Sequence, residues 1–156
     1  DSKIALACSM LLSTCSGLRI MLSRSQIAWL EVAVKLAEDS TCRMKHGALI
    51  VRGSSVLGMG TNKFRNHPKW VTDYDNCSRH AEMVALRSVI RMSDYVDLSK
   101  AILYVGRVNR KGEIRNSRPC DACWNELDKA GIRTMVFTTD LPEVGILERW
   151  KGNTSS

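Results

Sequence analysis

The spacing of apolar residues changes along the chain, and each change predicts an element. From residue 23 they recur every three or four positions, at Ile27, Leu30, Val34 and Ala37. This is the spacing of a helix with one buried face, and Ser23 followed by Gln26 is the pattern of a capping box. A first helix is therefore predicted from residue 23.

A hairpin of two strands comes next in the pattern. The segments ALIVRG (48–53) and SSVLGMG (54–60) are predicted strands that turn at Gly53 and Ser54. The first of them is a nearly continuous apolar run, as expected of a strand that is covered on both faces. A loop rich in turn formers, aromatic residues and mixed charge follows it.

The second half of the chain alternates helices and strands. AEMVALRSVIRM (81–92) is a predicted helix with Met83, Leu86 and Ile90 on one face, and AILYVGRV (101–108) is a strand. After a turn at 109–112, CDACWNELDKAG (120–131) is a helix that Gly131 ends, TMVFTT (134–139) is a buried strand, and a short helix is expected within 141–150. This alternation indicates an α/β fold with a mostly parallel sheet covered on both faces.

Composition adds the class of protein. The 156 residues, 44% of them hydrophobic and 25% charged, are typical of one globular domain, which we place at residues 23–156 after an N-terminal extension of residues 1–22. The apolar stretch IALACSMLLSTC (4–15) is too interrupted to span a bilayer, and with Lys3 as its basic flank it resembles at most a degenerate signal sequence. Six scattered cysteines favour a reduced, cytoplasmic protein, and the net charge of +7 favours a polyanionic partner.

Two short motifs carry candidate chemistry. His80-Ala81-Glu82 stands at the start of one predicted helix, and Pro119-Cys120 with Cys123 stands at the start of the next. Cysteines three apart share one helix face, and Pro119 suits a helix start because it lacks an N–H. One imidazole and two thiolates are the ligands of a catalytic zinc site that keeps its fourth position for water.

The spacing H-x-E…P-C-x-x-C matches the signature of zinc nucleobase deaminases at every specified position. From residue 23 to about 140 the chain resembles the cytidine and deoxycytidylate deaminase superfamily, and in particular its small phage-type members. The resemblance implies a three-layer α/β/α sandwich with a mixed five-stranded sheet, a Zn²⁺ ion on His80, Cys120 and Cys123, and Glu82 as the acid and base that moves protons. It also implies that Asn62 contacts the sugar and base, and that the backbone N–H of Ala81 meets the pyrimidine carbonyl.

Other interpretations of the motifs stay open from the sequence. A structural zinc site would want a fourth protein ligand, and His46, His67, Cys42 and Cys77 are the spare donors, which could also hold a second zinc. A redox C-x-x-C pair is a further alternative, but it leaves Glu82 unexplained.

The substrate class is suggested by position 80 and by the charges near the two motifs. A histidine at position 80 departs from the three-cysteine pattern of free cytidine deaminases, and two basic groups flank the metal ligands in sequence. They are Lys63 and Arg65 with Trp70 before His80, and Arg107, Arg110, Lys111, Arg115 and Arg118, set against a single Glu113, before Cys120. Cations interleaved with aromatic residues suit single-stranded nucleic acid, so a cytosine-containing polynucleotide is favoured over a deoxycytidine nucleotide such as dCMP. An adenine or guanine substrate, and a non-catalytic zinc-binding or nucleic-acid-binding protein, are the remaining alternatives.

Overall fold

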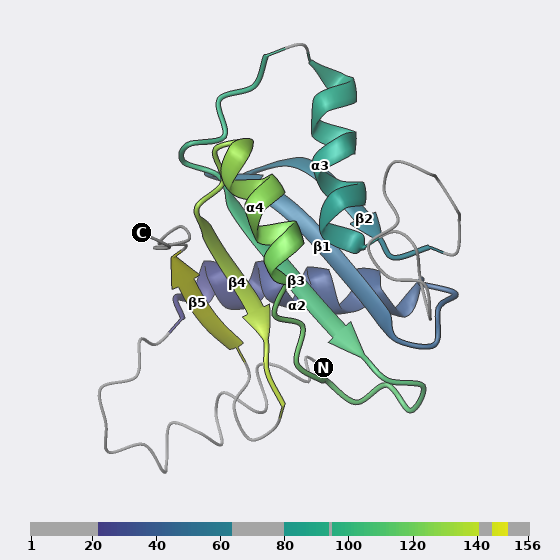
Figure 1. Cartoon of the computed structure of the whole chain (residues 1–156). Coiled ribbons are helices and arrows are strands. Elements are labelled where there is room, and N and C mark those ends of the chain that lie inside the picture. Colours follow the sequence, from purple (N-terminus) through teal and green to yellow (C-terminus); the bar gives the residue numbers. More distant parts are fainter. Residues whose placement is uncertain (1–21, 64–79, 94, 141–144, 150–156) are drawn as a thin grey trace, which may run out of the picture.

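The computed structural model describes residues 22–63, 80–93, 95–140 and 145–149. In chain order its elements are α2 (Arg24–Glu38), β1 (Lys45–Arg52), β2 (Ser55–Thr61), α3 (Ala81–Met92), β3 (Ile102–Val108), α4 (Asp121–Lys129), β4 (Thr134–Thr138) and β5 (Gly145–Arg149). The strands form one sheet in the order β2-β1-β3-β4-β5. Figure 1 shows α2 behind this sheet and α3 and α4 in front of it, so the three-layer α/β/α sandwich is confirmed.

The sheet is mixed, as expected, but it contains more antiparallel than parallel strand pairs, so the expectation of a mostly parallel sheet is wrong. Among the strands in the described residues, only β3 and β4 pair in parallel, and they are joined through α4. The pairs β1 with β2, β1 with β3, and β4 with β5 are antiparallel. A parallel pair needs a crossover connection, which helix α4 provides, whereas the tight turn at Gly53, with a φ of 64°, makes β1 and β2 a hairpin. Alternation of helices and strands in the sequence does not distinguish these cases.

Local signals were mostly predicted correctly. The capping box at Ser23 is present, with Gln26 N–H donating to Ser23 Oγ at 3.2 Å and Ser23 N–H to Gln26 Oε1 at 2.9 Å. Gly131 ends α4 with a φ of 100°. Residues 145–149 form the edge strand β5 where a short helix was expected, because pairing with β4 decides the conformation of a segment of weak periodicity. Ile90 is also 59% exposed, and Val89 is buried in its place.

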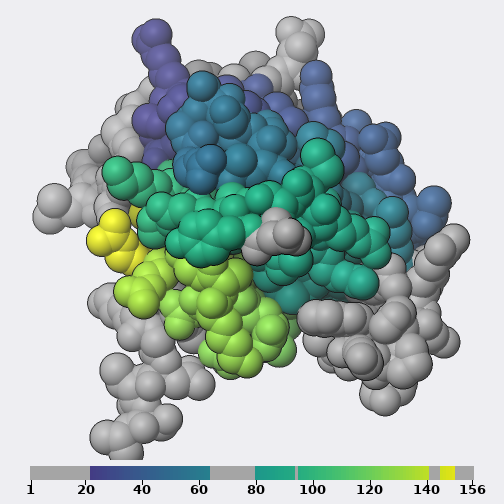
Figure 2. Space-filling model, turned by 90° about the horizontal axis from the view of Figure 1, so that it is seen from above, coloured from purple at the N-terminus to yellow at the C-terminus, as the bar shows by residue number. Residues whose placement is uncertain are grey.

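Two apolar layers hold the sheet. One fills the space between α2 and the sheet, and the other lies under α3 and α4 and contains Ala48, Ile50, Leu103 and Val105. Figure 2 shows α3 (teal) and α4 (yellow-green) adjoining at the surface above this second layer. Both helices begin at the end of the sheet to which the arrows of β3 and β4 point (Figure 1), so their first turns meet there.

Candidate active site

His80 is placed by the start of α3. It is the N-cap residue, with extended backbone (φ −70°, ψ 145°), and its side chain makes no capping hydrogen bond. The imidazole instead faces the cysteines of α4, with Nδ1 3.2 Å from Cys123 Sγ and 3.7 Å from Cys120 Sγ. The predicted convergence of the two helix starts is therefore present.

Cys120 and Cys123 come from the first turn of α4. Cys120 is its N-cap residue, again with extended backbone and no side-chain cap, while Cys123 is 1% exposed. Both are free thiols. The segment before them is fastened by Ser117, whose hydroxyl donates to Val105 O at 2.9 Å and accepts from Thr138 N–H at 2.9 Å. Because these bonds join the carboxyl ends of β3 and β4, they fix where the thiol groups lie.

The three side chains fit a zinc ion. Their ligand atoms all lie within 4.8 Å of one another. A tetrahedral zinc ion with bonds of about 2.0–2.3 Å holds its ligand atoms about 3.5–3.8 Å apart, close to the two nitrogen–sulfur distances above. Within the described residues, no fourth histidine, cysteine or acidic group joins this cluster. The arrangement therefore matches a site with three protein ligands and an open position.

The electrostatics of the two thiols differ. The pKa of Cys120 falls to about 4, first because Cys123 donates a hydrogen bond to its sulfur and then because His80 does. The pKa of Cys123 is raised, because its proton is shared with Cys120 and because it is buried. Thiolates are the forms that bind zinc, so a cation held by these side chains would favour deprotonation of both sulfurs.

Glu82 is buried beside this cluster. It lies in the first turn of α3, two residues after His80, and is 4% exposed. Burial raises the pKa of its carboxyl group, although its own backbone N–H and the charge of His80 act in the opposite direction. A carboxyl group with a raised pKa close to a metal site is suited to both accepting and donating a proton near neutral pH.

Asn62 and Ala81 lie at the same end of the sheet, but they differ in what they can offer. Ala81 is the first residue of α3, so its N–H has no acceptor within the helix and suits an external oxygen. Asn62 follows β2, is 5% exposed, and uses its carboxamide within the protein, where it accepts from Ser40 Oγ at 2.6 Å and donates to Met44 O at 2.6 Å. No sequence pattern predicts that Ser40 and Ser117 support the site.

Several of the predicted nucleic-acid contacts are engaged within the protein. Arg118 donates to both carboxylate oxygens of Glu148 at 3.0 and 3.1 Å. Arg115 bonds Glu113 at 2.6 Å, and Arg107 donates from Nη1 to Asn116 O at 3.1 Å.

The remaining residues predicted to bind nucleic acid are either exposed or outside the described residues. The side chains of Arg110 and Lys111 are exposed at the turn of residues 109–112, which follows β3, and Lys63 is exposed after β2. Arg65 and Trp70 lie outside the described residues.

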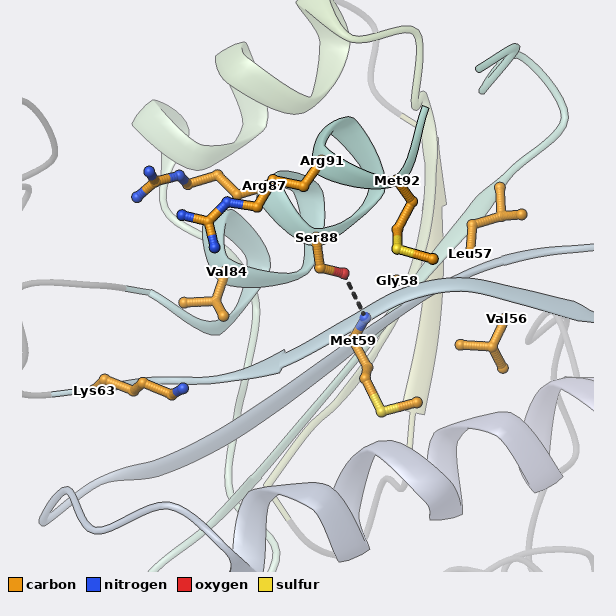
Figure 3. Close-up of a pocket in the computed structure, with 10 residues that line it drawn as sticks. All are labelled: Val56, Leu57, Gly58, Met59, Lys63, Val84, Arg87, Ser88, Arg91 and Met92. Carbon is orange, nitrogen blue, oxygen red and sulfur yellow. Dashed lines mark hydrogen bonds between the residues drawn. The ribbon is translucent and has the colours of Figure 1, made fainter. Parts of the chain in front are cut away.

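A basic groove lies between β2 and α3, away from the ligand cluster. Its volume is about 480 Å³. Figure 3 shows Arg87 and Arg91 extending from α3 and Lys63 from the end of β2, with apolar side chains such as Met92 and Val56 at the other end. Ser88 Oγ accepts from Met59 N–H at 3.3 Å along its floor. The groove therefore offers cations at one end only.

The spare donors do not form a second cluster in the described part of the chain. Cys42 is disulfide-bonded, so the expectation of reduced cysteines is wrong at this position, and Cys42 offers no thiolate to a metal. His46 lies in β1, while His67 and Cys77 lie outside the described residues. The N-terminal extension, apart from Leu22, lies outside them too.

The chain is similar in sequence and in fold to known deaminases. The family model for the cytidine and deoxycytidylate deaminase zinc-binding region matches residues 23–139. The fold is similar to that of dCMP deaminase from the cyanophage S-TIM5, with a TM-score of 0.54 and 21% identity over 78% of this chain and 87% of that chain. It is also similar to that of guanine deaminase from Bacillus subtilis, with a TM-score of 0.52 and 21% identity over 76% of this chain and 66% of that chain.

No curated protein matches the chain. Among the described helices, none has the length and apolar character needed to cross a bilayer.

Proposed function

This chain belongs to the cytidine and deoxycytidylate deaminase family, whose members share the zinc-binding region found at residues 23–139, and we propose that it converts the cytosine of a free nucleotide to uracil. The reaction consumes one water molecule and releases ammonia. The observation that carries the chemistry is the cluster of His80, Cys120 and Cys123 next to the buried Glu82.

Each residue has a distinct part in this reaction. His80, Cys120 and Cys123 would hold a zinc ion, which when bound would lower the pKa of a water ligand to about 7 and so supply the nucleophile. Glu82 takes one proton from the attacking water and passes it to the ring nitrogen, and it then takes the remaining proton of the same oxygen and passes it to the departing amine. The N–H of Ala81 holds the pyrimidine carbonyl, which sets the distance of the reacting carbon from the ligand cluster.

The pairing of Arg118 favours a nucleotide over a polynucleotide. A strand several nucleotides long needs several unoccupied cations, whereas Arg118 and Arg115 are bonded to carboxylates and Arg107 is bonded to a backbone oxygen. One phosphate needs only one or two donors. A cyanophage enzyme of similar fold is a dCMP deaminase, and it has been observed in complex with dCMP and dUMP.

A cytosine-containing polynucleotide is the second candidate, and the groove of Figure 3 favours it. Its cations Arg87 and Arg91 lie along α3, whose first turn carries the site, Lys63 lies after β2, and Arg110 and Lys111 are exposed at the turn of residues 109–112. Surface ion pairs contribute only about 0–1 kcal/mol, so phosphates could also displace the carboxylates now bound to arginine.

One experiment tests both candidates. The zinc-loaded protein is incubated with dCMP, cytidine, guanine and a cytosine-containing DNA oligonucleotide, and uracil or ammonia release is measured. We expect dCMP to be the preferred substrate. No deamination of any of the four by zinc-loaded protein would contradict the proposed function.

Salt dependence then separates the two substrates. Each phosphate contact on a single strand contributes a slope of about −0.7 in log affinity against log salt, so three or four contacts give about −2 to −3. The double variant Arg110→Glu/Lys111→Glu should reduce such a slope and leave dCMP turnover unchanged. Lys100→Glu, at the opposite end of β3, is the matched control.

A further inference from the structure

Two glycines of β2 lie directly against helix α3. Gly58 and Gly60 are both buried and, being two apart in a strand, share the face that α3 covers. A Cβ atom at Gly58 would lie 2.6 Å from the Ala85 carbonyl oxygen, and one at Gly60 would lie 2.8 Å from the Ala85 nitrogen. Ordinary contacts of a Cβ atom are 3.4–4 Å, so residues with a side chain at these positions would keep the helix further from the strand.

The contacts of the two glycines follow α3 in steps of about one turn. Gly58 lies against Ser88 (Figure 3), and Gly60 lies against Val84, four residues earlier in the helix. Two residues of a strand span about 6.6 Å and four residues of a helix span about 6 Å, so β2 and α3 run alongside each other in opposite directions. The next residue on the same face of β2 is Asn62, which this spacing brings level with the first turn of α3. The distance between helix and strand at the glycines therefore also sets their distance at the site.

The contact at Gly60 reaches the ligand cluster through one turn of helix. Val84 Cγ1 would lie 2.6 Å from a Cβ atom at Gly60. The N–H of Val84 donates to the His80 carbonyl oxygen at 3.1 Å, which makes it part of the same turn as His80 and Glu82. A displacement of Val84 away from the sheet would consequently move both of these site residues.

The cysteines of α4 are fixed independently of this contact. Ser117, three residues before Cys120, bonds β3 and β4 through Val105 O and Thr138 N–H. An outward shift of α3 by about 0.8 Å, the difference between 2.6 Å and the shortest ordinary contact of 3.4 Å, would therefore separate His80 from the two sulfurs. Metal sites tolerate deviations of only about 0.2 Å in ligand distance, so such a shift is large.

We propose that Gly58 and Gly60 are positioning residues of the active site, because the absence of their side chains sets the depth at which α3 lies on the sheet. That depth places His80 at the two cysteines and Glu82 beside them. The expected effect on turnover rests on the proposed function, whereas the expected effect on metal binding does not.

Gly106 of β3 provides a matched control on the opposite face of the sheet. A Cβ atom at Gly106 would lie 2.7 Å from the Val34 nitrogen of α2, a helix-to-strand approach as close as those at β2. Helix α2 carries neither the ligands nor Glu82. Gly106→Ala should therefore lower stability, as the β2 variants do, without changing the ligand cluster.

The metal-binding test uses cobalt(II) in place of zinc, because the absorption bands of a cobalt ion bound by thiolates depend on the arrangement of its ligands. We expect the spectrum of Gly60→Ala to differ from that of wild type and its zinc affinity, measured against a competing chelator, to fall by about ten- to a hundredfold. Gly58→Ala should show a smaller change, because its contact lies one turn further from His80. Gly106→Ala should match wild type in both measurements.

The kinetic test uses the zinc-loaded proteins at a temperature at which all of them are folded. Gly60→Ala should lower kcat by about ten- to a hundredfold, since a misplacement of about 1 Å costs this much, whereas Gly106→Ala should stay within twofold of wild type. Urea denaturation should show lower midpoints for both variants. In Gly60→Ala/Val84→Ala, which removes the Cγ1 contact, kcat and zinc affinity should recover in part.

The inference is wrong if Gly60→Ala keeps the cobalt spectrum, zinc affinity and kcat of wild type, or if Gly106→Ala changes them equally. If Gly60→Ala does not fold, the comparison of Gly58→Ala with Gly106→Ala decides by the same measurements. Failure of the proposed function gives a different result. Wild type would then deaminate no substrate, while the cobalt spectrum and zinc affinity would still respond to Gly60→Ala and not to Gly106→Ala.

Discussion

The partly buried, neutral imidazole of His46 predicts how stability depends on pH. An unfolded chain holds His46 at its ordinary pKa of 6.5, whereas the folded protein holds it at about 4. Between these values the unfolded state binds more protons, so acidification favours unfolding. The stabilisation from His46 is therefore complete above pH 6.5 and is lost as the pH falls towards 4.

The magnitude follows from the two pKa values. A shift of one pKa unit corresponds to about 1.4 kcal/mol, so the full difference is on the order of 3 kcal/mol. Between pH 7 and pH 5, linkage of a single site with these pKa values removes about 2 kcal/mol of the free energy of unfolding. His46→Gln does not titrate and should lack this part of the pH dependence.

Urea denaturation of wild type and His46→Gln at several pH values measures the effect. Zinc dissociation on acidification destabilises both proteins alike, so the difference between them isolates His46. We expect wild type to lose about 2 kcal/mol more than the variant from pH 7 to pH 5. A difference that stays constant over this range would show that His46 titrates alike in both states, and the description of its surroundings would then be wrong.

The other predictions concern the metal, the proton shuttle and the packing of α2. Protein purified without added metal should contain about one zinc per chain, and elemental analysis of a Cys120→Ser/Cys123→Ser variant that found the same content would exclude the site. Glu82→Gln should keep the zinc and lose at least about 10²-fold in kcat, and near-wild-type turnover would assign proton transfer to another group. Gly47→Ala should destabilise the protein by roughly 1–3 kcal/mol in urea denaturation, because its Cβ would lie 2.4 Å from the Ala33 carbonyl oxygen of α2; a stability equal to wild type would contradict this close approach.

The metal centre could be predicted because its information is local. His80 and Cys120 each cap a helix, and a helix start fixes the direction of the first turn whatever the rest of the chain does. The spacing of Glu82 from His80 and of Cys123 from Cys120 then places their side chains relative to that turn. The donor types alone identified zinc, since imidazole with two thiolates suits few other ions.

Features that depend on partners distant in sequence were not predictable. The charge on Arg118 is countered by Glu148, thirty residues later, on a segment that the sequence pattern assigned to a helix. Strand β5 forms because β4 offers it an edge, and an edge strand has little periodicity of its own. The arginines of residues 107–118 were therefore predicted to be free for nucleic acid, whereas in the structure Arg118, Arg115 and Arg107 bond within the protein.

The residues around the ligand cluster show the same contrast between what the local sequence determines and what the tertiary structure determines. The sequence alone determined the ligands, the carboxylate and the helix starts that carry them, because each depends on residues at most four positions apart. Tertiary structure alone decided that Asn62 is occupied by Ser40 and His46, and that His46 stands opposite Arg107 beside the site. These contacts depend on sheet register, and register is set by pairing free energies summed over whole strands, which no short motif encodes.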